Sequence, residues 1–247
     1  MQHLDVTVVS QAISWLQQQP VWLCTVLSTY GSSPRSPGAL MAATRDGRYS
    51  GSLSGGCVEE DFLRRMAAGE YQAASQVIRY GEGGMTPNVA LPCGGVLDVL
   101  IEYLPASEAS IAYLRRIAGA LEGHHALIKR LTLPNACHSL EQSHFTSATQ
   151  VERRLEQITL HIAAAPRLLI AGLSSVALYC ADFAVALGFE VLVCENRPEA
   201  LDNFAAELKP GVTLLRQFPA KFIEEGGCHA NTAVVALTHD PRMDDLT

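Results

Sequence analysis

The sequence predicts an α/β protein in two domains, the second of them built on a parallel, doubly wound sheet. In residues 163–247, short apolar strands alternate with helices in the order strand, helix, strand, helix, strand. This order is typical of a Rossmann-like topology. Residues 1–162 carry an Asp46-Gly47 pair between two strand-like runs, which predicts a hairpin. We therefore expect an α/β domain over 1–162 and a Rossmann-like domain over 163–247.

The elements of the first domain follow from apolar spacing and from the residues that begin and end helices. Apolar residues recur at helical spacing in 5–18, and Pro20 ends that helix. Ser107 is a favourable N-cap for a later helix. Residues 134–150 are polar and weakly patterned, and they predict no element. We expect helices over 5–18, over 57–68 and from 107, and strands over 21–28, 39–44, 48–52, 76–80, 96–104 and 125–132.

The second domain is predicted in the same way. A short apolar strand over 167–171 is followed by a turn of glycine and serine and then by a helix that Gly188 ends. A polar helix and a linker separate the last two strands. We expect strands over 167–171, 189–194 and 232–237, helices over 176–187 and 198–208, and a linker from 209 to 231.

The composition excludes several classes of protein. The chain has 247 residues and a net charge of −7, and it carries no basic stripe, so we do not expect a nucleic-acid partner. No apolar run is long enough for a membrane helix, and the first residues do not resemble a secretory signal. Seven cysteines are scattered without a Cys-x-x-Cys pair. This usage argues against a disulfide framework and a zinc site, and it favours a reducing cytoplasm.

Two cysteines lie inside glycine-containing loops, Cys57 in Ser-Gly-Gly-Cys and Cys93 in Pro-Cys-Gly-Gly. Because glycine has no side chain, its N–H group and the neighbouring sulfur can approach a ligand closely. Cys57 also opens a predicted helix, where the positive end of the helix dipole lowers the pKa of a thiol. The two loops predict a site for an anionic or soft ligand. In the alternative interpretation, Cys57 is a small buried residue at a tight turn.

The turn after the first strand of the second domain partly matches a dinucleotide-binding fingerprint. It reads Gly-Leu-Ser-Ser-Val-Ala from Gly172, so that Ser174 stands where the fingerprint has its middle glycine. Glu195 ends the next strand at a spacing close to that of a ribose-binding acid. His239 follows the last predicted strand, at the edge where open α/β sheets bind ligands. These four residues are candidate nucleotide contacts, and a Rossmann-like domain that binds no dinucleotide is the alternative.

Three long motifs together resemble one known family. They are Gly-Ser-Ser-Pro-Arg-Ser-Pro-Gly at 31–38, Gly-Ser-Leu-Ser-Gly-Gly-Cys-Val-Glu at 51–59 and Leu-Pro-Cys-Gly-Gly at 91–95. In this order they are similar to the XdhC/CoxI family, the accessory proteins of xanthine dehydrogenase and related molybdenum hydroxylases. The second domain resembles the Rossmann-like C-terminal domain of that family, including Thr-His-Asp-Pro at 238–241. The resemblance covers nearly the whole chain.

The resemblance implies a non-catalytic chaperone rather than an enzyme. Such a protein binds molybdenum cofactor as cargo, assists its sulfuration and delivers it to an apo-enzyme of the xanthine dehydrogenase type. The resemblance also implies a homodimer, and it adds a cysteine desulfurase as a further candidate partner. The residues expected to bind the cofactor are Cys57, Cys93, Gly55, Gly56, Gly94, Gly95 and Arg35. Thiolates of Cys57 and Cys93 are the candidate molybdenum ligands, since soft sulfur donors suit such metals.

Other residues of these loops are expected to help in binding. The backbone N–H groups of Gly55 and Gly56 suit a phosphate or oxo-anion at a helix N-terminus. Arg35 would clamp a phosphate through its planar guanidinium, with a surface salt bridge as the alternative. Glu59 and Glu60 lie in the first helical turn, where they suit the dipole but would repel an anion. We therefore expect the two acids to act indirectly.

The chain departs from the family pattern in two places. The family has a Gly-x-Gly-His turn where this chain has Gly-Leu-Ser-Ser at 172–175, which weakens the case for nucleotide binding. The family's second domain also continues beyond the Thr-His-Asp-Pro segment. A parallel sheet that ended at its third predicted strand would leave a bare apolar edge. We therefore expect the second domain to be truncated at Thr247.

Two further functions stay open on the sequence alone. An NAD(P)-dependent oxidoreductase would use the Rossmann-like domain, and micromolar affinity for a nicotinamide nucleotide would support it. A sulfur-relay enzyme would use Cys57 and Cys93 as a transient disulfide. That bridge requires backbone movement if the two Cα atoms lie more than about 7 Å apart.

Overall fold

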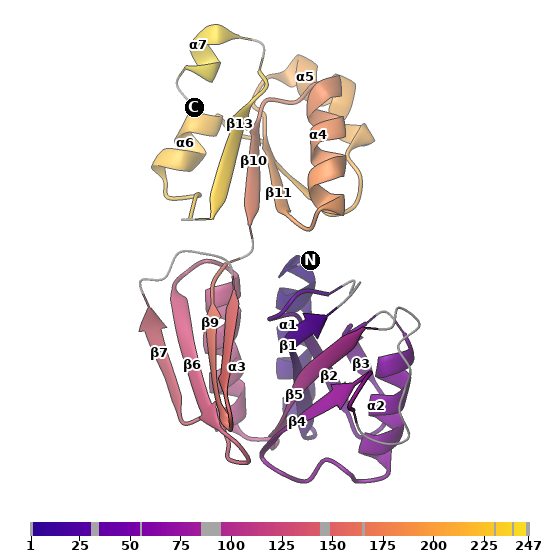
Figure 1. Cartoon of the computed structure of the whole chain (residues 1–247). Helices are drawn as coiled ribbons and strands as arrows, with labels where there is room; N and C mark the ends of the chain where they lie inside the picture. The colour runs from indigo at the N-terminus through magenta and orange to yellow at the C-terminus, as the bar shows by residue number, and fades with distance from the viewer. Residues whose placement is uncertain are drawn as a thin grey trace. The chain divides into compact units, whose positions relative to one another are not determined.

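The computed structural model describes residues 2–30, 35–54, 56–84, 95–143, 149–164, 166–229, 231–238 and 240–245. The chain divides into two compact units, one formed by Leu4–Ala163 and the other built from Ala164–Thr247 (Figure 1). Each unit is α/β, and the second contains a parallel sheet, so the predicted fold class is confirmed.

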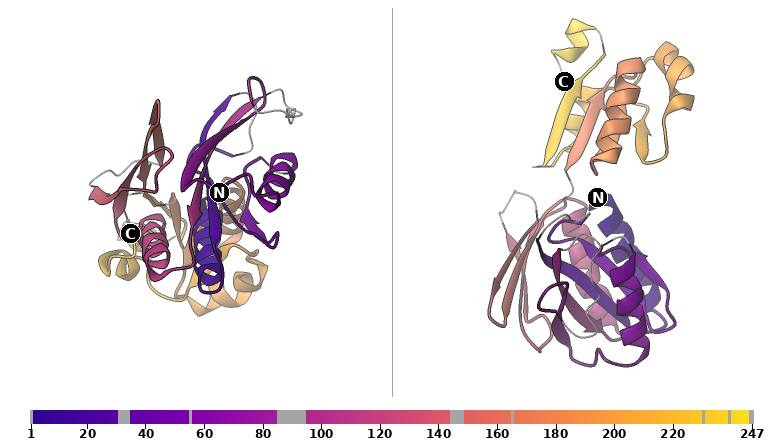
Figure 2. Two further views of the ribbon diagram at one scale, coloured as in Figure 1. Left: turned by 90° about the horizontal axis from the view of Figure 1, so that it is seen from below. Right: turned by 45° about the vertical axis from the view of Figure 1, so that its right-hand side comes forward.

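A five-stranded antiparallel sheet is the centre of the first unit. Its strand order is β3-β2-β1-β5-β4. Helix α2 covers one face, and α1 and α3 cover the other (Figure 2). The strands are β1 (Val21–Tyr30), β2 (Leu40–Thr44), β3 (Tyr49–Gly51), β4 (Ser75–Tyr80) and β5 (Val96–Leu104), and the helices are α1 (Gln2–Leu16), α2 (Cys57–Ala67) and α3 (Glu108–Leu121). All eight elements were expected, with small differences at their ends.

Both faces of this sheet are buried, which explains the continuous apolar run of β1. Val21, Leu23 and Leu27 pack toward α1 and α3, whereas Trp22 and Cys24 pack toward α2. Alternate side chains of a strand point to opposite faces, so a strand between two layers must be apolar at every position. The prediction of a buried strand here is confirmed.

A second antiparallel sheet packs with α3 against the same core, in the order β7-β6-β9-β8. Its strands are β6 (Ala126–Thr132), β7 (Ser139–Ser143), β8 (Gln150–Arg154) and β9 (Gln157–Ile162). Only β6 was expected. β7 and β8 are the outer strands and are mostly polar, since their side chains are half-buried or exposed. Their sequences therefore lack the apolar alternation that predicts a strand.

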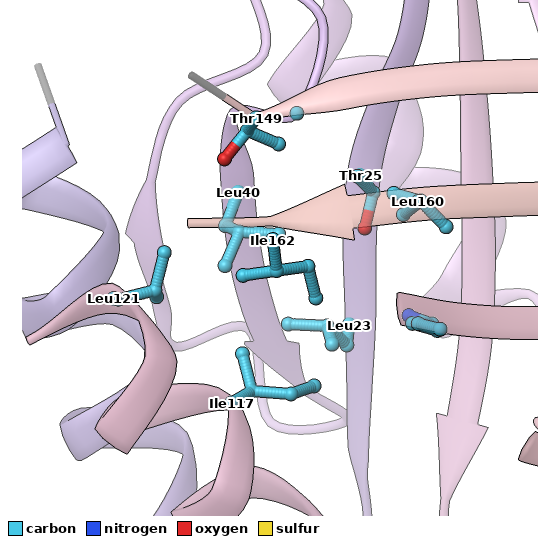
Figure 3. A pocket seen from close by; sticks show the side chains of 10 residues that line it. Leu23, Thr25, Leu40, Ile117, Leu121, Thr149, Leu160 and Ile162 are labelled. Carbon is cyan, nitrogen blue, oxygen red and sulfur yellow. The ribbon is translucent and has the colours of Figure 1, made fainter. Parts of the chain in front are cut away.

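A cavity of about 20 Å³ lies inside the first unit. Leucine and isoleucine side chains from β1, β2, α3 and β9 surround it (Figure 3). Thr25 also lines the cavity, and its side chain is 1% exposed. Among the described residues, its hydroxyl has no hydrogen-bond partner. A buried hydroxyl without a partner destabilises the folded state.

We expect Thr25→Val to raise the free energy of unfolding by about 1 kcal/mol, because a methyl group replaces an unpaired hydroxyl of similar size. Urea unfolding of the full chain measures the change. Thr44→Val is the matched control, since the buried Thr44 hydroxyl donates to the Arg48 carbonyl at 3.2 Å. The control should lose stability. If Thr25→Val lost as much, the hydroxyl would have a partner.

The second unit is a four-stranded parallel sheet in the order β12-β11-β10-β13. Its strands are β10 (Arg167–Ala171), β11 (Glu190–Cys194), β12 (Val212–Leu215) and β13 (Thr232–Ala236), and its helices are α4 (Ser175–Ala186), α5 (Pro198–Phe204), a short 3-10 helix (Ala205–Glu207), α6 (Pro219–Glu224) and α7 (Pro241–Asp244). The expected linker from 209 to 231 is wrong, because it contains β12 and α6. Both elements are short, and β12 is an edge strand that is not fully buried, so their apolar signal is weak.

Candidate functional site

The connections that carry the three motifs all leave the five-stranded sheet at the same end. β1 ends at Tyr30 opposite Val96, where β5 begins, and β4 ends at Tyr80 opposite Leu97. β2 begins and β3 ends at this end too, because Met41 pairs with Gly51. Connections 31–39, 52–56 and 81–95 therefore start and finish at one edge of the sheet. This topology brings together the described ends of the connections that carry the three motifs, although the motifs are up to 60 residues apart in the sequence.

Not all the predicted cofactor-binding residues are described. Cys93, Gly55 and Gly94 lie outside the described residues, and so does the side chain of Cys57. The backbone of Cys57 begins α2, as expected. That the two sulfur atoms lie close together in one site therefore stays a prediction.

Glu59 organises the loop that precedes Cys57. Its Oε1 accepts hydrogen bonds from the Leu53 N–H at 2.7 Å and the Ser54 N–H at 2.9 Å, and its Oε2 accepts one from the Gly56 N–H at 2.9 Å. The hydroxyl groups of Ser52 and Ser54 also donate to this carboxylate. Glu59 is only 4% exposed. The Gly56 N–H, which we expected to bind an anion of the ligand, therefore already donates its hydrogen bond to Glu59.

Arg35 is buried rather than exposed, and its guanidinium is already paired. Its Nη2 donates to Asp5 Oδ1 at 2.8 Å, and its Nε donates to the Ser52 carbonyl at 3.1 Å. Asp5 also accepts the Leu40 N–H at 2.9 Å. Arg35 therefore fixes the β3–α2 loop to α1 and β2. The expected phosphate clamp and the expected surface salt bridge both require an exposed guanidinium, which Arg35, at 5% exposure, does not have.

The Asp5 carboxyl has a pKa of about 6, above its ordinary value. Burial is the main cause, and it outweighs the Leu40 N–H and Arg35, which lower the pKa. The folded state therefore holds a proton that the unfolded state releases between about pH 4 and 6. Under this linkage the stability that Asp5 contributes is present at low pH and is lost as the pH rises through about 6.

We expect wild-type stability to fall from pH 4 to pH 6 by up to about 3 kcal/mol relative to Asp5→Asn, in which the group cannot titrate. Urea unfolding of both proteins at several pH values in this window measures the difference. Parallel stability profiles for the two proteins would show that Asp5 titrates with an ordinary pKa.

Gly81, which directly follows β4, is needed for close packing against Gly95. A Cβ atom on Gly81, which has a φ of +94°, would lie 2.1 Å from the Gly95 carbonyl oxygen. Both the positive φ and this contact require glycine at position 81. At the base of the connection that carries Cys93, the backbones of Gly81 and Gly95 are therefore in close contact.

In the second unit, the described candidates for nucleotide contact, Gly172, Ser174 and Glu195, lie at the carboxyl ends of β10 and β11. The chain reverses its strand order between β10 and β13, and such a switch point is where open α/β sheets bind ligands. Gly172 directly follows β10 there with a φ of +98°, and a Cβ atom on it would lie 2.6 Å from Thr238 Cα. Ser174 caps α4 by accepting the Ala177 N–H at 3.3 Å. His239 lies outside the described residues.

Glu195 is buried and fully engaged by the protein. It accepts the Leu173 N–H at 2.8 Å, and Arg197 donates to both carboxylate oxygens at 3.0 and 2.7 Å. Burial acts to raise the pKa of Glu195, but these hydrogen bonds together hold it below the ordinary value. Arg197 also donates to the Thr238 carbonyl at 2.8 Å. The Leu173 N–H and the acid that a dinucleotide would use are thus already paired with each other.

Arg197 was not singled out from the sequence. It lies two residues after Glu195 and immediately before Pro198, which starts α5. A cation so close to a predicted ribose-binding acid is a signal that could have indicated an internal ion pair.

Neither a metal site nor a membrane helix is found in the described part of the chain. No three histidine, cysteine, aspartate or glutamate side chains there are grouped as metal ligands, and the sulfur atoms of Cys57 and Cys93 lie outside this part. No helix of the described ranges is long and apolar enough to cross a bilayer.

The fold and the loops define a class of protein with an antiparallel α/β unit that carries glycine-rich loops and a Rossmann-like second unit. The sequence model of the XdhC and CoxI family matches residues 14–81, and that of the XdhC Rossmann domain matches residues 168–247. The two matches cover more than half of the chain, which belongs to the XdhC and CoxI family. The predicted family is confirmed.

Three known proteins are similar to this chain. A probable xanthine dehydrogenase subunit of Bacillus subtilis is 25% identical over 250 residues, which cover 92% of this chain and 74% of that protein. The Escherichia coli "Molybdenum cofactor insertion chaperone PaoD" is 36% identical over 99 residues, 38% of this chain and 30% of that protein. The crystal structure of a xanthine dehydrogenase from Bacillus halodurans has a TM-score of 0.66 at 21% identity, and the match covers 97% of this chain and 76% of that chain. At this identity the structural likeness shows the fold alone.

Proposed function

We propose that this protein is a non-catalytic chaperone that binds molybdenum cofactor and inserts it into a xanthine dehydrogenase-type enzyme. The observation that carries the proposal is the convergence of the three motif-bearing connections at one end of the five-stranded sheet. The chain belongs to the XdhC and CoxI family, and a relative is named a molybdenum cofactor insertion chaperone. Both findings agree with a carrier whose binding groups lie on loops held by a rigid sheet.

The proposed contacts follow the chemistry of the cargo, a pterin with a phosphate and a dithiolene that binds molybdenum. Cys57 and Cys93 supply thiolates as soft donors to the metal. Gly55, Gly94 and Gly95 let the backbone approach the pterin or its phosphate. Gly56 and Arg35 act differently from the expectation, because they hold the loop in place through Glu59, Asp5 and Ser52.

Purified protein should bind molybdenum cofactor at about one molecule per chain. The measurement is equilibrium binding of cofactor released from a molybdoenzyme, followed by transfer to an apo-enzyme of the xanthine dehydrogenase type. We expect transfer to restore activity to the apo-enzyme. A chain that is folded, binds no cofactor and activates no apo-enzyme would contradict the proposed function.

Sulfuration is a further part of the proposal. A thiol beside bound cofactor is suited to carry a sulfur atom, and a cysteine desulfurase is the partner that would supply it.

We propose the cytoplasm as the location, because the described cysteines Cys24, Cys137, Cys180, Cys194 and Cys228 are all free thiols.

A homodimer is proposed on one surface of the second unit. Val176, Tyr179, Phe183 and Leu187 lie on one face of α4 and its C-cap, and each is more than half exposed. If a whole large side chain presents about 150–250 Å², these exposed parts amount to roughly 500 Å² per copy. Two copies would bury about 1,000 Å², the lower limit for a specific interface.

Sedimentation of wild type and Phe183→Glu tests this dimer. The wild-type chain should sediment as a dimer and the variant as a monomer, because an isologous interface would bury the new charge in both copies. Asp182→Asn, on the neighbouring face where Asp182 pairs with Lys209, should leave the dimer intact. A wild-type monomer, or a Phe183→Glu dimer, would contradict this interface.

A nucleotide in the second unit has weaker support. The topology favours it, whereas the pairing of the Leu173 N–H with Glu195 and the packing of Thr238 against Gly172 oppose it. Titration with NAD and NADP decides the point, and we expect no micromolar affinity.

A further inference from the structure

Three buried charged side chains meet around the loop that precedes Cys57. They are Asp5 on α1, Arg35 in the connection between β1 and β2, and Glu59 in the first turn of α2, and each is at most 5% exposed. Ser52 joins them, because its carbonyl accepts from Arg35 and its hydroxyl donates to Glu59 at 2.6 Å. The contacts thus run from α1 through the β3–α2 loop into α2.

Within this network, Glu59 makes the contacts that determine the shape of the loop. Among the described residues 52–54 and 56, five hydrogen bonds reach its carboxylate, three from backbone N–H groups and two from hydroxyls. Gly56 caps α2 with a φ of +154°, a conformation that the hydrogen bond from its N–H to Glu59 helps to hold. Glu60, the next residue along the helix, is exposed.

We propose that Glu59 is a positioning residue for cofactor binding, which holds loop 52–56 and thereby the Cys57 position in the geometry that receives the cofactor. The inference rests on the proposed function. It also assigns the loop's amide groups: those of Leu53, Ser54 and Gly56 support the loop from inside and do not contact the phosphate. A carboxylate is required for this role, because both of its oxygens accept hydrogen bonds and neither donates. An amide side chain would turn an NH₂ group toward some of these donors.

The test compares Glu59→Gln with Glu60→Gln, which removes the same charge from the same helical turn. The first measurement is amide hydrogen exchange of the full chain without cofactor. We expect the amides of Leu53, Ser54 and Gly56 to exchange at least tenfold faster in Glu59→Gln and at the wild-type rate in Glu60→Gln. Unchanged exchange in Glu59→Gln would overturn the positioning role, whether or not the chain binds cofactor.

The second measurement is the dissociation rate of molybdenum cofactor, with the melting temperature measured beside it. We expect release at least tenfold faster from Glu59→Gln and wild-type release from Glu60→Gln. Ser54→Ala is a milder variant, because it deletes only one hydroxyl contact to Glu59, and it should speed release even if Glu59→Gln folds poorly. Faster exchange with wild-type release from both Glu59→Gln and Ser54→Ala would overturn the link between the loop and the cofactor. A wild-type chain that shows the expected exchange but binds no cofactor would instead contradict the proposed function.

Discussion

Replacing Glu102 with alanine is expected to lower the free energy of unfolding of the first unit by about 3–5 kcal/mol. Glu102 on β5 and Lys129 on β6 form an ion pair whose side chains are each 2% exposed. Tyr113 donates its hydroxyl to the same carboxylate at 2.9 Å, and the Lys129 ammonium lies 5.6 Å from the Tyr113 ring centre. Without Glu102, the positive charge of Lys129 would stay in the core without an anion.

Urea unfolding of the full chain, followed by a signal from the first unit, measures this loss. Glu141→Ala is the matched control, because Glu141 pairs with Arg130 but is 64% exposed, so that solvent screens the pair and its contribution to stability is small. The double variant Glu102→Leu, Lys129→Met removes both charges and should recover most of the stability. Equal losses for Glu102→Ala and Glu141→Ala would show that the pair is not buried in solution.

Cys57→Ala and Cys93→Ala are each expected to speed the release of molybdenum cofactor at least tenfold. The reason is the loss of a soft thiolate donor to the metal. Release rates from the purified, loaded chain measure the effect. Cys137→Ala and Cys180→Ala are the controls, since these thiols are half-buried in other parts of the fold. Full retention of cofactor by the double variant Cys57→Ala, Cys93→Ala would exclude a role for both thiols.

Most strands with strong apolar spacing could be predicted from the sequence, but β9 was missed although its buried residues Ile158, Leu160 and Ile162 alternate along the strand. Strand β5 was expected over its whole length, and the Asp46-Gly47 turn was sufficient to predict the β2–β3 hairpin. Strands β7, β8 and β12 could not be predicted, because they lie at sheet edges and need few apolar residues. Their formation depends on pairing with a neighbouring strand, which a local pattern does not record.

The candidate site could be predicted as a set of loops but not as a set of roles. Spacing alone could not show that the connections carrying the three motifs start and finish at one end of a sheet, since this follows from strand pairing. It also could not show which charges are buried. Arg35 resembles an exposed anion clamp in sequence, and only its pairing with Asp5 gives it a structural role. Glu59 was expected to act indirectly, and its hydrogen bonds show how.

In the second unit, too, the position of a site residue could be predicted from the sequence but its role could not. Glu195 was expected at the end of the second strand, and it directly follows β11; its spacing from Gly172 suggested a ribose-binding role. The pairing of Glu195 with Arg197 depends on a turn of three residues whose geometry the fingerprint does not contain. A matching topology therefore did not predict what the acid binds.

The most direct test of the account is thiol footprinting of the full chain with and without molybdenum cofactor. Iodoacetamide would label the cysteines, and mass spectrometry would give the labelling rate at each position. If the motif loops form one binding face, cofactor will slow the labelling of Cys57 and Cys93 together and leave that of Cys137 and Cys180 unchanged. Cofactor that binds without protecting either Cys57 or Cys93, or that protects only one of them, would contradict a shared site at this end of the sheet.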